Sequence, residues 1–235
     1  ILWTIRKKIV DKCLSVGMGL YSIIPDFNKF KEEMHQHIEL PIDTPKINSN
    51  EFSELYDNDV IFILSHEAGK QKKAVDGEKI PDTKKNKFIK LFENPYWRRP
   101  LSNMYEKEYT CDNKRWLTTE HFMQANKFKL QPEIYNEFSL DSNSEISKNA
   151  NIARSYGENT LYKSKKYRPS GIQEDKIYNI NEIYNKVYLC KIEQLPEFRD
   201  TLINTKDAKL LQKIRYKKVP RQQDELMQIR KNLIK

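Results

Sequence analysis

The sequence predicts an α+β fold: a mostly helical domain with a few short strands, preceded by a helical and extended N-terminal segment. Most patterned stretches repeat their apolar residues every three or four positions, which is the spacing of one helix face. Three short runs, at 59–65, 88–92 and 108–111, are instead rich in β-branched or aromatic residues, as strands are. At 235 residues, the chain is long enough for one ordinary domain with an extension.

The N-terminal part is expected to begin with two helices. An apolar stripe over residues 1–24 ends at Pro25, and a shorter one over 26–39 leads into a proline-bracketed linker. Three basic residues at 6–8, with no acid in the first ten positions, are compatible with the remnant of a mitochondrial targeting segment. A basic amphipathic helix explains them equally, so import into an organelle is a hypothesis.

A domain boundary is expected near residue 87. Residues 67–86 are rich in Gly, Lys and Asp and predict a loop. The chain then divides into an N-terminal extension, 1–87, which includes the strand at 59–65, and a main domain, 88–235.

Helices are expected along most of the main domain. A turn at Asp112–Asn113 follows the strand at 108–111, and Pro196 has the position of a first helical residue. The small residues Ala150, Ala153 and Gly157 allow a helix to pack closely against a neighbour. The expected helices are 130–140, 150–157, 180–194, one from Pro196, a short one at 209–214, and a last one capped by Asp224.

The composition indicates a basic chain. The net charge of +9 favours polyanionic partners. No apolar run approaches the length of a membrane span, and the sequence contains no zinc-protease, P-loop or dinucleotide-binding motif, so no metal or cofactor is expected. Cys13, Cys111 and Cys190 are far apart and odd in number, which predicts a reducing, intracellular compartment without a disulfide framework.

The stretch from Trp116 to Phe128 is the one around which the domain is organised. Thr118 or Thr119 can cap a helix in which Glu120 lies near the positive end of the helix dipole. Glu120, Gln124 and Lys127 have the spacing i, i+4, i+7 and share one face. Such a stripe on an otherwise apolar helix suggests the lip or floor of a pocket. The alternative is a solvated face with a Glu–Lys pair.

The motifs L-S-N-M-Y, at 101–105, and T-x-E-H-x-x-Q-A-x-K-F, at 118–128, resemble the signature of the NADAR or YbiA-like family. The best-described members are N-glycosidases that cleave ribose from a base-like amine in riboflavin-pathway intermediates, and some relatives remove ADP-ribose from guanine. The resemblance covers roughly residues 88–235, with further likeness at 147–157, 191–211 and 225–233. It implies that Glu120 is the catalytic carboxylate. It implies that ligand contacts come from Ser102, Asn103, His121, Gln124 and Lys127.

The sequence departs from the family pattern at residues 215–223. The family has a glycine-rich, tryptophan-containing loop there, whereas this chain reads R-Y-K-K-V-P-R-Q-Q and has no glycine after Gly171. Glycine permits close backbone approach to a ligand, whereas the β-branched and proline residues found here do not. Half of the expected pocket is therefore replaced by basic residues. The family tryptophan near the start of the preceding helix also has no counterpart between Tyr167 and Tyr184.

Three functions are compatible with this pattern. The lost loop and the positive charge favour a catalytically degenerate, RNA-contacting subunit of a ribonucleoprotein, such as an organellar ribosome, with RNA and neighbouring proteins as partners. The alternative is an active N-glycosidase with a ribosyl or ADP-ribose ligand, and a third is an ADP-ribose-binding module without catalysis. An AT-rich genome would also produce the basic charge without any RNA partner.

The first function assigns RNA contacts to basic residues that lie near aromatic ones or in the replaced loop. For the cluster at 94–100, a rigid surface turn with an Arg–aromatic stack is the competing interpretation. The expected RNA contacts are Arg98, Arg99, Lys163, Lys165, Lys166, Arg168, Arg215, Lys217, Lys218 and Arg221.

Overall fold

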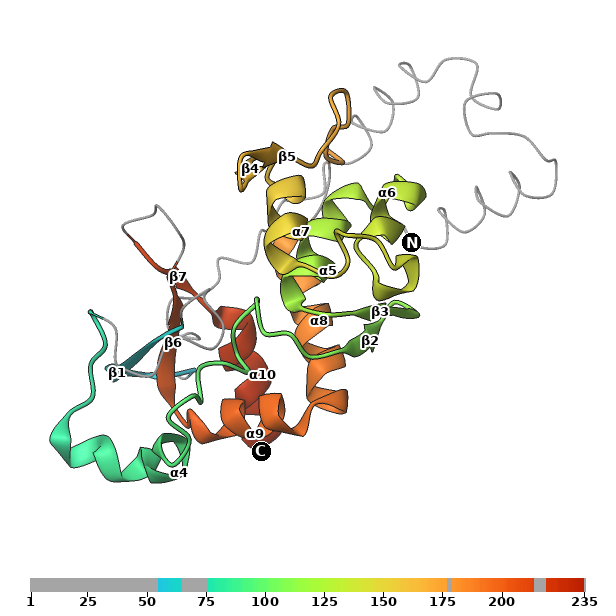
Figure 1. Ribbon diagram of the computed structural model, residues 1–235. Coiled ribbons are helices and arrows are strands. Elements are labelled where there is room, and N and C mark those ends of the chain that lie inside the picture. Colours follow the sequence, from blue (N-terminus) through green and yellow to red (C-terminus); the bar gives the residue numbers. More distant parts are fainter. Residues whose placement is uncertain (1–54, 65–75, 177–178, 214–218, 235) are drawn as a thin grey trace, which may run out of the picture. The chain divides into compact units, whose positions relative to one another are not determined.

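Figure 1 shows the computed structural model, which describes residues 55–64, 76–176, 179–213 and 219–234. All of them belong to one compact unit, Ser49–Lys235. The helices expected at 1–24 and 26–39, and the linker after them, lie outside the described residues. Within the described ranges, no helix combines the length and the apolar character that crossing a membrane requires.

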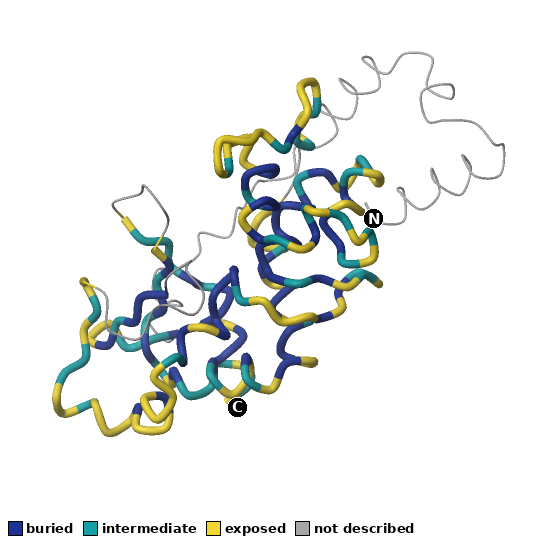
Figure 2. Tube along the Cα trace, viewed as in Figure 1, coloured by how far each residue is buried: buried dark blue, intermediate teal, exposed yellow. Residues whose placement is uncertain are grey.

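The described residues have the α+β fold that the sequence predicts, with helices outnumbering short strands. Figure 2 shows that the buried residues follow the inner faces of these elements. The 3-10 helices are η2 (Asp82–Phe88), η3 (Asn126–Phe128) and η4 (Leu140–Ser142). The α-helices are α4 (Ile89–Phe92), α5 (Thr119–Ala125), α6 (Pro132–Glu137), α7 (Ala150–Gly157), α8 (Ile180–Gln194), α9 (Pro196–Asn204) and α10 (Asp224–Ile234).

The largest sheet joins distant parts of the chain. Strand β1 (Asp57–Leu64) runs parallel to β6 (Ala208–Gln212), and β6 pairs antiparallel with β7 (Arg221–Gln222). The short helix expected at 209–214 is therefore wrong, because residues 208–212 form the central strand β6. Burial alternates along β6, with Ala208 and Leu210 fully buried, so pairing with β1 and the packed core outweigh local helix propensity.

The same sheet bears on the expected domain boundary. Strand β1 lies before residue 87, yet its register places Phe62 opposite Leu210. The compact unit begins at Ser49. Residues on both sides of position 87 therefore share one sheet, and the expected boundary near residue 87 stays a prediction.

The strand expected at 88–92 is also wrong. Residues 82–88 form η2 and residues 89–92 form α4. Phe88 and Leu91 are buried three positions apart, and the ring of Phe88 lies edge-on to Phe62, with 5.1 Å between centroids. Even where turn signals bound it, a short apolar run cannot be assigned to a strand or to a buried helix from its pattern alone, which explains the error.

A β-hairpin leads into the central helix α5. Strands β2 (Tyr109–Cys111) and β3 (Lys114–Trp116) pair antiparallel, and Asp112 and Asn113 both have positive φ, as the predicted turn requires. Trp116 is fully buried, with its ring 5.2 Å from that of Phe122. A second small hairpin consists of β4 (Leu161–Tyr162) and β5 (Lys165–Lys166).

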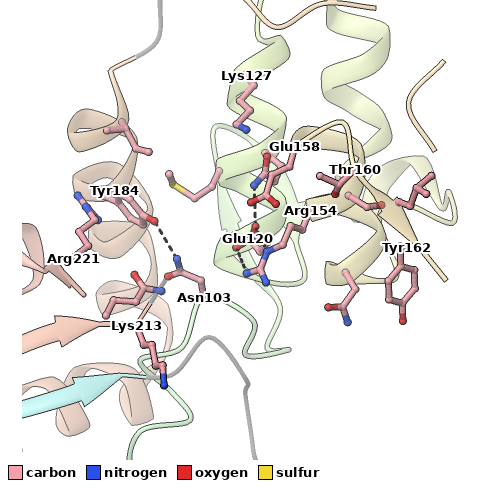
Figure 3. A pocket seen from close by; sticks show the side chains of 17 residues that line it. Asn103, Glu120, Lys127, Arg154, Glu158, Thr160, Tyr162, Tyr184, Lys213 and Arg221 are labelled. Carbon is pink, nitrogen blue, oxygen red and sulfur yellow. Dashed lines mark hydrogen bonds and ion pairs between the residues drawn. The ribbon is translucent and has the colours of Figure 1, made fainter. Parts of the chain in front are cut away.

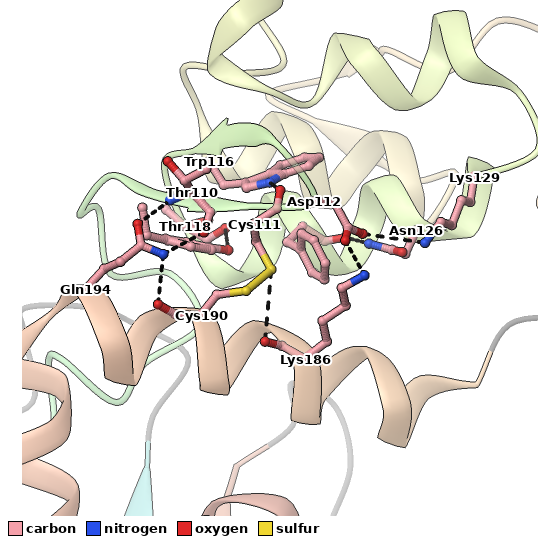
Figure 4. The surroundings of a disulfide bond; sticks show 12 residues. Thr110, Cys111, Asp112, Trp116, Thr118, Asn126, Lys129, Lys186, Cys190 and Gln194 are labelled. Atoms are coloured by element: carbon pink, nitrogen blue, oxygen red, sulfur yellow. Dashed lines mark hydrogen bonds and ion pairs between the residues drawn. A yellow bond between two sulfur atoms is a disulfide. The ribbon is translucent and has the colours of Figure 1, made fainter.

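Cys111 in β2 and Cys190 in α8 form a disulfide (Figure 4). The expectation of a chain without disulfides is therefore wrong. The two residues are 79 positions apart, and only the packing of β2 against α8 brings their Cα atoms to 5.8 Å. Between the same two elements, the backbone N–H of Thr110 donates to Oε1 of Gln194 at 2.8 Å, and Nε2 of Gln194 donates to the carbonyl of Thr110 at 2.6 Å. The cellular compartment stays a prediction.

Helix α8 also carries a buried lysine. Lys191 is 1% exposed, and its Nζ donates to the hydroxyl of Thr119 at 3.2 Å. The ammonium lies 4.2 Å from the ring centroid of Phe198 and forms no ion pair with a carboxylate in the described part of the chain. Burial lowers the pKa of Lys191 to about 7, although Glu197 opposes the shift.

Replacing Lys191 with Met is expected to flatten the pH dependence of stability above pH 7. Between pH 7 and 10.5 the unfolded lysine keeps a proton that the folded one has lost, so stability rises with pH in the wild type. This group contributes up to about 1.4 kcal/mol per pH unit. Urea unfolding at pH 7, 8 and 9 measures the slope, and exposed Lys148→Met is the control. If the unfolding free energy of the wild type and of Lys191→Met rose equally with pH, the lowered pKa of Lys191 would be contradicted.

Candidate functional site

Helix α5 begins where the sequence predicts. Thr118 has extended backbone, and its hydroxyl accepts a hydrogen bond from the backbone N–H of His121 at 3.2 Å, so Thr118 is the N-cap. The backbone N–H of Glu120 donates to the carbonyl of Asn103 at 2.9 Å. Every residue of α5 is buried, which excludes the alternative of a solvated Glu–Lys face.

The Glu120 carboxylate is held by two neighbours. Arg154 in α7 donates to it twice, from Nε to Oε1 at 3.0 Å and from Nη2 to Oε2 at 3.1 Å. The amide Nε2 of Gln124 donates to Oε1 at 2.9 Å. Burial by itself raises the pKa of Glu120, but the charge and hydrogen bonds of Arg154, with the hydrogen bond from Gln124, lower it below its ordinary value.

Glu120 is consequently a carboxylate at neutral pH and cannot act as a proton donor. An ionised carboxylate offers roughly four lone-pair positions, of which Arg154 and Gln124 occupy three. One position, on Oε2, is left for a water molecule or a ligand. The two-point bond from Arg154 also fixes the plane of the carboxylate.

Helix α7 packs against α5 through its small residues. Ala150, Ala153 and Gly157 are all buried, as their spacing predicts. The closest approach is at Gly157, where a Cβ atom would lie 1.9 Å from Oε1 and 2.8 Å from Cβ of Gln124. Gly157 is therefore the residue that leaves room for the Gln124 side chain beside Glu120.

The change Gly157→Ala is expected to displace Gln124 and break its bond to Glu120. Overpacking of this kind costs about 1–3 kcal/mol of unfolding free energy, measured by urea denaturation. In the double variant Gly157→Ala/Gln124→Ala the two closest clashes are gone, so part of the loss should be recovered. If Gly157→Ala had the stability of the wild type, α5 and α7 would be able to move apart and accept the added methyl group without an energetic cost.

These side chains line a pocket of about 520 Å³ (Figure 3). This volume is in the range of small-molecule sites. One side comes from α5, η3 and α7, and the other from α8 and the ends of β6 and β7. The residues labelled in Figure 3 are Asn103, Glu120, Lys127, Arg154, Glu158, Thr160, Tyr162, Tyr184, Lys213 and Arg221.

A hydrogen-bonded wall closes the side formed by α8. The amide of Asn103 donates to the hydroxyl of Tyr184 at 3.2 Å. The guanidinium of Arg221 lies 4.4 Å from the centroid of the Tyr184 ring and donates to Glu225 at 2.5 Å. Burial raises the pKa of Tyr184, so this phenol stays neutral. The wall presents a fixed amide, a phenol and a cation.

Four of the six catalytic and ligand-binding residues implied by the family resemblance line the pocket: Asn103, Glu120, Gln124 and Lys127. Ser102 and His121 do not. The Ser102 hydroxyl accepts from the backbone of Met104 at 3.2 Å.

His121 has partners outside the pocket. Its Nδ1 lies 2.8 Å from the Thr118 hydroxyl, and its Nε2 lies 3.0 Å from the carbonyl of Ile146. Burial lowers the pKa of His121 to about 4, so the ring is a neutral part of the core.

The basic residues expected to contact RNA differ in their exposure to solvent. Arg98 is buried and paired with Glu78 at 2.7 Å, and Arg168 is buried and donates to the carbonyl of Tyr156 at 2.7 Å. Neither guanidinium is open to a polyanion. Arg221 lines the pocket, whereas the exposed ones are Arg99, Lys163, Lys165 and Lys166. Arg215, Lys217 and Lys218 lie outside the described residues.

Sequence reasoning missed Arg154, Tyr184 and Lys213. Arg154 lies in the stretch 147–157 that resembles the family, but only folding brings it to Glu120. Tyr184 and Lys213 carry no local signal at all. Among the described residues, no group of three His, Cys, Asp or Glu side chains is placed to hold a metal ion.

Fold and pocket together define an α+β protein with a polar cavity of small-molecule size. Protein-family models and curated proteins give no match to this chain. Among solved structures, the chain is similar to the NMR structure of the E. coli protein YbiA. The TM-score is 0.45 at 18% sequence identity, over 74% of this chain and 86% of YbiA.

Proposed function

We propose that this chain binds a small ribosyl compound in the Glu120 pocket and cleaves its N-glycosidic bond. The observation that supports this most is the convergence of Glu120, Gln124, Asn103 and Lys127 on one polar cavity of about 520 Å³. They come from a loop, α5 and η3, and a merely structural role for Glu120 would not require an open space beside it.

The ionised state of Glu120 suits this chemistry. Cleavage of a glycosidic bond passes through a transition state with positive charge at the anomeric carbon, which a carboxylate stabilises. In the proposed hydrolysis the oxygen of water forms a bond to that carbon while the carbon–nitrogen bond breaks. The leaving nitrogen takes up a proton, and water loses one. Because Glu120 holds no proton, it serves as charge stabiliser or as the acceptor from water. The ammonium of Lys127 donates to the carbonyl of Gly157 at 3.0 Å and lies 3.8 Å from Glu174, and in this proposal one of its protons goes to the leaving nitrogen.

An experiment with the purified chain tests this proposal. A ribosyl-amine 5′-phosphate and an ADP-ribosylated guanosine are incubated with it separately, and free base is measured by chromatography. Base release from at least one of them, absent with Glu120→Gln, is the expected result. Failure to release base from both would contradict the proposed cleavage.

The second candidate is the role as an RNA-contacting subunit without catalysis, for which an organellar ribosome is the leading particle. It is favoured by the net charge of +9 and by the exposed hairpin that carries Lys163, Lys165 and Lys166. Binding through such lysines would weaken steeply as salt rises. Sedimentation of the native protein, with and without ribonuclease and at low and high salt, tests it. Migration as a free small protein under all conditions would exclude this role.

A further inference from the structure

A chain of hydrogen-bonded side chains lies behind the wall that α8 contributes to the pocket. The hydroxyl of Tyr188 in α8 donates to Oε1 of Gln223 at 3.3 Å and lies 3.5 Å from Oδ1 of Asn103. Nε2 of Gln223 in turn donates to Oε1 of Gln212 at 3.0 Å. Asn103 and Gln212 line the pocket, whereas Tyr188 and Gln223 lie outside the lining. Two buried side chains therefore connect two lining amides.

The two connecting side chains are completely enclosed. Tyr188 is 1% exposed and Gln223 is not exposed at all. The ring of Tyr188 is stacked between those of Tyr184 and Phe198, with 5.4 and 5.9 Å between centroids, which fixes the position of its hydroxyl. Burial raises the pKa of Tyr188, so the phenol keeps the hydrogen that it donates. Because a buried polar group that loses its partner is destabilising, each member of the chain depends on the next.

Gln223 ends the segment in which the sequence departs from the family pattern. Its backbone N–H donates to the carbonyl of Leu210 at 3.0 Å, and its carbonyl accepts from the N–H of Met227 at 3.1 Å. These bonds attach Gln223 to β6 on one side and to α10 on the other. A glycine at this position would have no side-chain amide for Tyr188. The replaced segment therefore supplies a contact of its own behind the pocket.

Asn103 is held by its backbone and by both ends of its side-chain amide. Its carbonyl accepts from the backbone N–H of Glu120 at 2.9 Å. Its Nδ2 donates to the Tyr184 hydroxyl at 3.2 Å (Figure 3), and its Oδ1 faces Tyr188. The last torsion of an Asn side chain has a broad distribution, so an amide that is bound at one atom only can turn. Binding at both atoms removes that freedom.

We propose that Tyr188 and Gln223 are positioning residues that hold the Asn103 amide in place beside Glu120. Gln223 thereby gives the segment that replaces the glycine-rich loop a role in the pocket. A displacement of about 1 Å in an active site can slow a reaction about 10²-fold, so these residues affect the rate without touching the ligand. This inference rests on the proposed function, because it assumes that Asn103 contacts the ligand during cleavage.

The change Tyr188→Phe keeps the stacked ring and removes only the hydroxyl. It should lower kcat for base release about tenfold, the effect of one lost hydrogen bond, and change KM less. In a protein that already carries Asn103→Ala, Tyr188→Phe should have no further effect, because it acts through Asn103. Tyr135→Phe is the matched control, since Tyr135 is also buried but its hydroxyl has no hydrogen-bond partner among the described residues. A wild-type kcat for Tyr188→Phe, or a further tenfold loss in the double variant, would overturn the inference.

A second measurement does not require activity. Hydrogen exchange of the Asn103 side-chain amide, followed by NMR, should be about tenfold faster in Tyr188→Phe and unchanged in Tyr135→Phe. Gln223→Met should also shift the Asn103 signals, although the Gln223 side chain bonds only Tyr188 and Gln212 within the described ranges. Asn103 signals that stay unchanged in both variants would overturn the inference. If the wild type releases no base, the proposed cleavage is contradicted, and the amide exchange decides the positioning by itself.

Discussion

Replacing Glu120 with Gln is expected to lower the rate of base release by about 10²–10⁴-fold. Gln has nearly the same shape but no negative charge, so it neither stabilises positive charge on ribose nor accepts a proton from water. In the wild type, activity should persist to below pH 4.5, because the ion pair with Arg154 keeps the pKa of Glu120 under that ordinary value. Chromatographic measurement of free base over pH 4–8 gives both results.

The control for this variant is Glu133→Gln, which removes an exposed carboxylate of α6. Its rate should equal that of the wild type. Urea unfolding of Glu120→Gln shows whether the protein is still folded, since Arg154 loses a charged partner. A folded Glu120→Gln protein with the wild-type rate would remove Glu120 from the reaction.

Replacing Arg154 with Met should cost about 3–5 kcal/mol of unfolding free energy at pH 7. Glu120 has 7% of its side chain exposed, and Arg154 supplies two of its three hydrogen bonds. Without that partner the carboxylate would be a buried charge with only Gln124 to bind it. The exposed pair of Arg115 and Asp141 is the matched comparison, and Arg115→Met should cost about 0–1 kcal/mol.

The cost of Arg154→Met should shrink as the pH falls. In the wild type the pKa of Glu120 is lowered, so its ionised form adds stability above pH 4.5 that disappears as pH falls through the folded pKa. In Arg154→Met only burial acts strongly, the pKa of Glu120 rises, and protonation relieves the buried charge. Urea unfolding at pH 7 and pH 5 measures both costs. An equal loss at the two values would mean that Glu120 finds another partner.

A double variant separates the ion pair from simple packing. Glu120→Gln/Arg154→Met has neither charge, so it should be more stable than Arg154→Met alone. If the double variant is the less stable of the two, the loss in Arg154→Met comes from packing and not from the unpaired carboxylate.

Local sequence patterns are sufficient to predict an element's boundaries where its conformation depends mainly on its own residues. The range of α8 and the start of α9 at Pro196 are confirmed, and of the two expected N-cap candidates for α5, Thr118 and Thr119, the structure has Thr118. Strand β6 and helix α4 were missed for a different reason. Their conformations depend on β1, which contributes the strand beside β6 and the aromatic Phe62 beside Phe88, and no local pattern reveals such distant contacts.

The candidate site divides in the same way. Spacing on one helix predicted that Glu120, Gln124 and Lys127 share a face, and all three line the pocket. Arg154 could not be assigned to Glu120 from sequence, because the contact joins α5 to α7. The disulfide of Cys111 and Cys190 was missed for the same reason, since 79 residues separate the two thiols.

The most direct test of the Glu120 pocket as a ligand site is a backbone amide NMR titration of the chain with adenosine 5′-monophosphate. We expect saturable shifts concentrated in α5, α7 and the first turns of α8, which carry Glu120, Arg154 and Tyr184. Shifts confined to the hairpin with Lys163 and Lys165, or no shift at millimolar nucleotide, would contradict it.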